Sequence, residues 1–166
     1  MTRRHFLAAA LGAFPLAVLR AAPNALSPLD EQSFRQMVAA HRGKVLLVEF
    51  WATWCAACRE EMPKLLALRA SYSAGDFAMV TISCDEPEQE RGAQAFLEKQ
   101  SAPSPRYIKR AKDDDAFINS IDPKWSGALP ALFLYDRSGQ LAAKFIGESS
   151  TASIQAAIKQ ALAEGG

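Results

Sequence analysis

The sequence predicts one α/β domain in which helices cover both faces of a mostly parallel β-sheet. Residues 44–50 form a continuous apolar run between turn residues, which is typical of a strand buried on both faces of such a sheet. Strand and helix patterns then follow as strand–helix–strand and later as strand–strand–helix. The 166 residues, of which 49% are hydrophobic and 22% charged, suffice for one ordinary core and are too few for two.

Each expected element has its own local pattern. Residues 23–27 are typical of a linker, and Ser27 is expected to cap a helix that continues to about Ala40 and is ended by Gly43. A short turn with glycine at residues 136–139 predicts a hairpin. The other expected elements, in chain order, are a helix at about 58–71, a strand at 77–84, a helix at 86–100, a short extended segment at 106–109, a short helix at 113–121, strands at 131–135 and 141–146, and a helix at 151–163.

Residues 1–22 have the layout of an export signal. Arg3 and Arg4 precede an uncharged apolar run at 6–19, which is shorter than the roughly 20 residues that a membrane-spanning helix needs. The two arginines favour a twin-arginine signal and an ordinary secretory signal equally. Pro23 makes the cleavage point near Ala22 a weak one, so an uncleaved membrane tether is an alternative. We expect a periplasmic protein whose domain comprises residues 23–166.

The charge of the exported domain indicates which partners to exclude. Removing the signal leaves 16 basic residues against 18 acidic ones. This balance gives no reason to expect nucleic acid or an anionic membrane as a partner. We expect a monomer.

Two of the three cysteines, Cys55 and Cys58, lie where the first strand gives way to a helix. A thiolate is the form that attacks a disulfide, and the N-terminus of a helix stabilises its negative charge. We therefore expect Cys55 to be the nucleophile. Cys58, one helical turn further on, is expected to resolve the mixed disulfide. Cys84 is expected to be a buried, inert thiol, with a third redox thiol near the site as the alternative.

The resolving cysteine needs a group that accepts its proton, and two carboxylates are candidates. Glu49 lies inside the apolar strand, where an unpaired charge costs several kcal/mol, although a strand-end or edge position would explain it. Glu61 lies three residues after Cys58, on the same helix face, and the alternative role for it is a solvated acid at the start of the helix. The sequence does not choose between them.

Metal and haem sites explain the cysteines poorly. A zinc site needs about four ligands, and beside the cysteines only His41 remains after the signal. Covalent haem attachment needs a histidine directly after the second cysteine, where Arg59 stands. We expect no metal and no cofactor other than the redox-active cysteine pair.

The segment Phe50-Trp-Ala-Thr-Trp-Cys-Ala-Ala-Cys-Arg-Glu-Glu-Met-Pro63 resembles the active-site segment of the thioredoxin superfamily. It is most similar to the exported TlpA/ResA-like branch, which includes the cytochrome c maturation thioredoxins, and the similarity extends from about residue 44 to the C-terminus. The resemblance implies a thioredoxin-like fold, with a central mixed sheet flanked by helices on both faces. Residues 85–109 resemble the βα insertion of the TlpA-like branch.

The same resemblance implies roles for particular residues. Residues 127–130 occupy the place of a cis-proline loop, in which Pro130 faces the dithiol and the Leu129 backbone offers hydrogen bonds to an extended substrate. The other expected substrate contacts are Trp54, Ala56 and Ala57. Trp125, just before this loop, is expected to contact substrate or to serve in packing.

Comparison with the family also places the two acids. Glu61 falls where reductive members carry a functional acid, and Glu49 falls where thioredoxin carries a buried aspartate. The chain departs from the family at Ala131, where threonine is usual. It departs again between the cysteines, where Ala56-Ala57 lacks the common proline.

The function that the resemblance implies is that of a periplasmic thiol:disulfide oxidoreductase. We expect it to reduce disulfides of protein substrates, to be re-reduced by an integral-membrane thiol electron donor, and to take part in cytochrome c assembly. The alternatives are an oxidant or isomerase, and a non-catalytic metal-binding or chaperone module.

Overall fold

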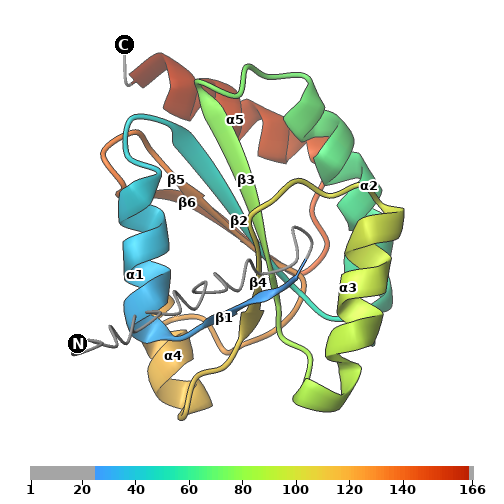
Figure 1. The fold of residues 1–166 in the computed structure, drawn as a ribbon. Helices are drawn as coiled ribbons and strands as arrows, with labels where there is room; N and C mark the ends of the chain where they lie inside the picture. Colours follow the sequence, from blue (N-terminus) through green and yellow to red (C-terminus); the bar gives the residue numbers. More distant parts are fainter. Residues whose placement is uncertain (1–24, 165–166) are drawn as a thin grey trace, which may run out of the picture.

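The computed structural model describes residues 25–164, and the expected export signal lies outside these residues. A six-stranded sheet with the strand order β1-β4-β3-β2-β5-β6 forms the centre of the molecule (Figure 1). The elements are β1 (Ser27–Leu29), α1 (Glu31–Ala40), β2 (Val45–Trp51), α2 (Ala56–Ala70), β3 (Phe77–Ser83), a 3-10 turn (Pro87–Gln89), α3 (Glu90–Lys99), β4 (Arg106–Lys109), α4 (Asp114–Ile121), β5 (Ala131–Tyr135), β6 (Leu141–Ile146) and α5 (Thr151–Glu164).

The sheet is mixed, as the resemblance implied. The fully buried strand β2 pairs in parallel with β3 and antiparallel with β5, so it lies at the junction of the two kinds of pairing. Strands β1 and β4 extend the parallel side, and β6 adds an antiparallel hairpin partner to β5. The predicted strand–helix–strand and strand–strand–helix order is therefore confirmed.

Alternate residues of β2 contribute to two separate hydrophobic cores, because successive side chains of a strand point to opposite faces. Leu47 and Trp51 pack in the core that α2, α3 and α5 cover. Val48 and Phe50 pack in the core that α1 and α4 cover. Figure 1 shows these two layers of helices on either side of the sheet.

The start of the described chain differs from the prediction. Ser27 does not cap a helix: residues 27–29 form β1, which pairs in parallel with β4. The N-cap of α1 is Asp30, whose carboxylate accepts a hydrogen bond from the Ser33 backbone N–H at 2.9 Å. A three-residue strand is too short to show alternation, and the partner that defines it lies some eighty residues further along the chain.

Two other boundaries differ by a few residues. The active-site helix α2 begins at Ala56 rather than at Cys58. The predicted helix at 86–100 is divided into the 3-10 turn and α3. No helix within residues 25–164 is both long enough and apolar enough to cross a membrane.

Candidate active site

The two cysteines of the predicted pair are joined by a disulfide at the N-terminus of α2. The Cα atoms of Cys55 and Cys58 lie 5.3 Å apart. Cys55 is the N-cap residue, and its sulfur accepts a hydrogen bond from the Cys58 backbone N–H at 3.2 Å. Cys55 is 8% exposed and Cys58 is fully buried, whereas Trp54 beside them is 62% exposed. The outer sulfur is therefore the one that a protein partner can reach.

Asp85 holds the loop that leads into the cysteine pair. Its buried carboxylate accepts hydrogen bonds from the backbone N–H of Thr53, at 3.0 Å, and from the Thr53 hydroxyl, at 2.6 Å. Ser83 donates a further hydrogen bond to it at 2.8 Å. Sequence reasoning missed this role. The available signal was that β2 and β3 are parallel neighbours, so the residues after their carboxyl ends meet at one edge of the sheet.

The loop before β5 has the predicted cis bond between Leu129 and Pro130. Gly127 has a φ of +82°, a left-handed backbone conformation that favours glycine, and a Cβ at this position would also press on Cδ1 of Ile118 at 2.8 Å. Trp125 is buried and donates a hydrogen bond from its indole N–H to the Ala128 carbonyl at 3.0 Å. Trp125 therefore packs beneath the loop and fixes its path.

Two cavities flank the cysteine pair. The first has a volume of about 250 Å³ and is lined by both Trp54 and Leu129, which brings the residue before Cys55 and the cis-proline loop to one site. The second has a volume of about 90 Å³ and is lined by Ala57, Glu60, Glu61, Lys64, Glu148 and Ser149. Ala56 is exposed and Ala57 is half-buried. Among the predicted substrate residues, Trp54 and Leu129 line the first cavity and Ala57 lines the second.

Both candidate acids are buried, Glu49 on β2 and Glu61 on α2 three residues after Cys58. Glu49 is fully buried, and Glu61 is 8% exposed. Burial raises the pKa of Glu49 well above its ordinary value of 4.5, and the charge of Glu61 raises it further. Burial also raises the pKa of Glu61, while Lys64 lowers it and Glu148 raises it. Each carboxyl can therefore hold a proton at a pH at which an ordinary glutamate is ionised.

Cys84 lies in the wall of the larger cavity, which it shares with Trp54 and Leu129. It is a free cysteine, and burial raises the pKa of its thiol to about 12. A thiol with such a pKa remains protonated at neutral pH and is a poor nucleophile. Cys84 is half-buried rather than fully buried as predicted, and the raised pKa of its thiol favours the inert role over that of a third redox cysteine.

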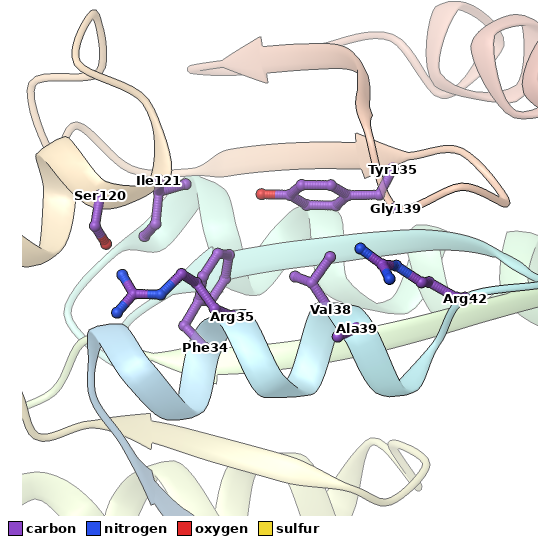
Figure 2. Close-up of a pocket in the computed structure, with 9 residues that line it drawn as sticks. All are labelled: Phe34, Arg35, Val38, Ala39, Arg42, Ser120, Ile121, Tyr135 and Gly139. Carbon is purple, nitrogen blue, oxygen red and sulfur yellow. The ribbon is translucent and has the colours of Figure 1, made fainter.

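A further surface cavity of about 290 Å³ lies far from the cysteines, between α1, α4 and β5 (Figure 2). Tyr135, which lines it, pairs with Leu46 near the start of β2, whereas the cysteine pair follows the end of that strand. No predicted site residue lines this cavity. Among residues 25–164, no group of three or more histidine, cysteine or acidic side chains is arranged to hold a metal ion.

Comparison with known proteins identifies the family. The Redoxin family model matches residues 19–162. The thiol:disulfide interchange protein HelX of Rhodobacter capsulatus is 32% identical over 74% of this chain and 63% of its own length. The thiol-disulfide oxidoreductase ResA of Geobacillus kaustophilus is 28% identical over 68% of this chain and 60% of its own length. The chain thus spans about 60% of the length of the curated ResA relatives.

Solved structures agree with the fold. A crystal structure of a thiol:disulfide interchange protein of the thioredoxin family from Chlorobium tepidum superimposes with a TM-score of 0.62, at 23% identity, over 86% of this chain and 99% of the other. A likeness at this identity shows the fold, and the family model covers most of the chain. The chain therefore belongs to the Redoxin family and has the thioredoxin-like fold.

Proposed function

We propose that this protein is a thiol:disulfide oxidoreductase that reduces disulfides of protein substrates in the periplasm. The observation that carries the proposal is the Cys55–Cys58 disulfide at the N-terminus of α2, with one sulfur accessible and the other buried. The names of the relatives HelX and ResA describe disulfide interchange and thiol-disulfide oxidoreduction. Both support the same chemistry for this chain.

The reductive half of the reaction starts from the dithiol form. The Cys55 thiolate attacks one sulfur of a substrate disulfide, and the second substrate sulfur leaves as a thiolate. The N-terminus of α2 and the Cys58 backbone N–H stabilise the negative charge on Cys55 before the attack. The product is a mixed disulfide between Cys55 and the substrate.

Resolution then requires the second cysteine. Cys58 gives up its proton to a buried acid, for which Glu49 and Glu61 are the two candidates, and its thiolate attacks the sulfur of Cys55. The Cys55–Cys58 disulfide forms, the bond to the substrate breaks, and the substrate leaves as a second thiolate that takes a proton from solvent. The substrate gains two electrons and the protein loses two. A membrane-bound dithiol that supplies two electrons would restore the reduced protein, and cytochrome c assembly is the pathway that family analogy favours.

The experiment that tests the proposal compares the wild-type protein with two cysteine variants. Reduced wild-type protein is expected to reduce insulin disulfides, and Cys55→Ser is expected to abolish this activity. Cys58→Ser is expected to accumulate mixed disulfides at Cys55, which mass spectrometry of proteins captured in the periplasm would identify. A wild-type protein without turnover, or a Cys55→Ser variant that retains it, would contradict the proposal.

The reduction potential of the cysteine pair shows whether the protein acts as a reductant or as an oxidant of its substrates. A reductant is expected to have a reduction potential near that of thioredoxin, about −270 mV, whereas a potential near about −120 mV would identify an oxidant. The potential of the Cys55–Cys58 couple can be measured by equilibration with glutathione or dithiothreitol.

A further inference from the structure

The two candidate acids are both buried, and they differ in their surroundings: Glu61 lines a cavity, whereas Glu49 is enclosed by the core. Glu49 belongs to the face of β2 that α2 covers, together with Leu47 and Trp51, and it is fully buried. Its neighbours on the adjacent strands are Thr81 and Leu132. No part of the Glu49 side chain reaches solvent, so a proton that arrives at Glu49 can leave only through a neighbouring group.

Glu61 is the acid that borders an opening. It is 8% exposed and lines the cavity of about 90 Å³ beside Ala57, which Glu148 and Ser149 close on the other side. Both carboxyl oxygens of Glu61 are themselves buried and have no hydrogen-bond partner among residues 25–164, so the adjoining cavity is the route by which water can reach them. A buried carboxyl that borders a small polar cavity without a partner is suited to exchange protons with water there.

Unpartnered polar atoms also gather around Glu49. Both of its carboxyl oxygens, the Thr81 hydroxyl and the Trp51 indole N–H are buried and have no hydrogen-bond partner within the described part of the chain. All three side chains belong to one face of the sheet, because Thr81 is the cross-strand neighbour of Glu49 and Trp51 lies two residues beyond it. Leaving a buried hydrogen-bonding group without a partner costs stability. This cost is difficult to explain by stability and is typical of functional sites.

No hydrogen bond joins the two carboxyls, but their charges are close enough to interact. The charge of Glu61 contributes to the raised pKa of Glu49, so ionisation of one acid opposes ionisation of the other. The pair therefore favours a state in which one carboxyl is ionised and the other is protonated. In that state Glu49 can accept a proton from Cys58 while Glu61 releases one into the cavity.

We propose that Glu49 and Glu61 act in series rather than as alternative acceptors: Glu49 receives the proton of Cys58, and Glu61 passes it to solvent through the adjoining cavity. This inference rests on the proposed function, because it concerns the resolving step. As Cys58 attacks the sulfur of Cys55, its proton moves to Glu49, a proton moves from Glu49 to Glu61, and Glu61 releases one to water. Re-reduction of the disulfide returns a proton along the same route.

A double-mutant cycle distinguishes a series from parallel acceptors. The variants are Glu49→Gln, Glu61→Gln and the combination, with Glu98→Gln on the exposed surface of α3 as the matched control. The measurement is the single-turnover rate at which each reduced protein is oxidised by a peptide disulfide. We expect each single variant to be at least about tenfold slower at pH 7, since acid–base groups contribute about a hundredfold or more. The double variant should lie within about twofold of the slower single variant, and Glu98→Gln within about twofold of wild type.

Other patterns of rates would contradict the series. Parallel acceptors would give mild single variants and a severe double variant, and independent roles would multiply the two effects. Either pattern would overturn the series, as would unchanged rates in all three variants. Wild-type turnover that Cys55→Ser abolishes would still support the proposed function, so failure of the relay and failure of the function are distinguishable.

A second measurement tests the relay through the charged residues that surround Glu61. The charged groups around Glu61 are Lys64 and Glu60 on α2, Glu148 after β6 and Glu49 on β2. Lys64→Gln should shift the pH midpoint of the resolving step upward, and Glu148→Gln should shift it downward, because Lys64 lowers and Glu148 raises the pKa of Glu61. Both shifts should disappear in the Glu61→Gln background. Shifts that persist there would show that the exit does not pass through Glu61.

Discussion

At the scale of single residues, the buried carboxyl of Glu49 makes the stability of the fold depend on pH. In the folded protein, burial raises the pKa of Glu49 above its ordinary value of 4.5, whereas in the unfolded chain the same carboxyl is exposed to water. Above about pH 4.5 the unfolded state releases this proton while the folded state keeps it. The free energy of unfolding therefore decreases as the pH rises from 4.5 toward the pKa of the folded protein.

Glu49→Gln removes this pH dependence. The variant is expected to match the wild type at about pH 4.5 and to become the more stable protein at higher pH, with the difference growing by up to about 1.4 kcal/mol per pH unit. Urea unfolding of the oxidised proteins at pH 5, 6, 7 and 8 would measure the difference. Parallel stability curves for the two proteins would contradict the expectation, and Glu98→Gln provides the surface control.

Sequence reasoning identified the residues that are unusual in their local sequence context. A carboxylate in an apolar strand and two cysteines at a helix start are both visible in the sequence, and the structure brings Glu49, Cys55 and Cys58 to one side of the sheet. Asp85 is not unusual in this sense, because an aspartate directly after a strand is common. Its hydrogen bonds to Thr53 depend on the pairing of β2 with β3, which local patterns do not specify.

At the scale of elements, the start of α1 shows why the predicted cap is wrong: Ser27 belongs to the short strand β1, and Asp30 caps the helix. Asp30 accepts the Ser33 backbone N–H, and the Ser33 hydroxyl accepts the Asp30 backbone N–H at 2.8 Å, which together form a capping box. Local propensity favours Ser27 as a cap equally well. Pairing with β4 decides against it, because backbone groups of residues 27–29 find their partners there.

Removing the cap should weaken α1 by a predictable amount. Asp30→Ala is expected to lower the melting temperature by about 2–4 °C, because the first turn of the helix loses a side-chain acceptor. Asp30→Asn keeps an acceptor at the same position and should remain close to wild type. Differential scanning calorimetry of the three proteins would measure this. Equal losses in both variants would show that charge, rather than capping geometry, matters at Asp30.

At the scale of the whole molecule, aromatic side chains join the sheet to the helices and to the active-site loop. The Phe50 ring packs against Phe34 of α1, Phe117 of α4, Phe133 of β5 and Trp125 beneath the cis-proline loop. The ring centroids of Phe50 and Trp125 are 4.8 Å apart. This core therefore supports the position of the loop as well as the fold.

Truncation at the centre of this cluster should be costly. Phe50→Ala is expected to reduce the free energy of unfolding by about 3–5 kcal/mol, because the surrounding rings cannot all close the cavity. Leu141→Ala, at an exposed position of β6, should change it by about 0.5 kcal/mol or less. Denaturant unfolding would compare them. A loss below about 1 kcal/mol for Phe50→Ala would show that the core collapses around the gap.

The overall architecture followed from the sequence more fully than the cavities did. Apolar runs and their order predicted the layered α/β fold, and the resemblance of residues 50–63 predicted the mixed sheet and the cis-proline loop. The two cavities beside the cysteines combine segments far apart in the chain, such as Ala57 with Glu148 and Trp54 with Leu129. Such combinations depend on tertiary packing, so periodicity and propensity do not indicate them.

The short strand β1 also determines how this molecule meets its neighbours. It covers the edge of β4, and the central one of its three residues is Pro28, which has no backbone N–H to offer. A strand from another copy would find no complete row of donors along β1. Edge-to-edge growth of the sheet is therefore blocked on this side, which protects concentrated protein from forming extended β-aggregates there.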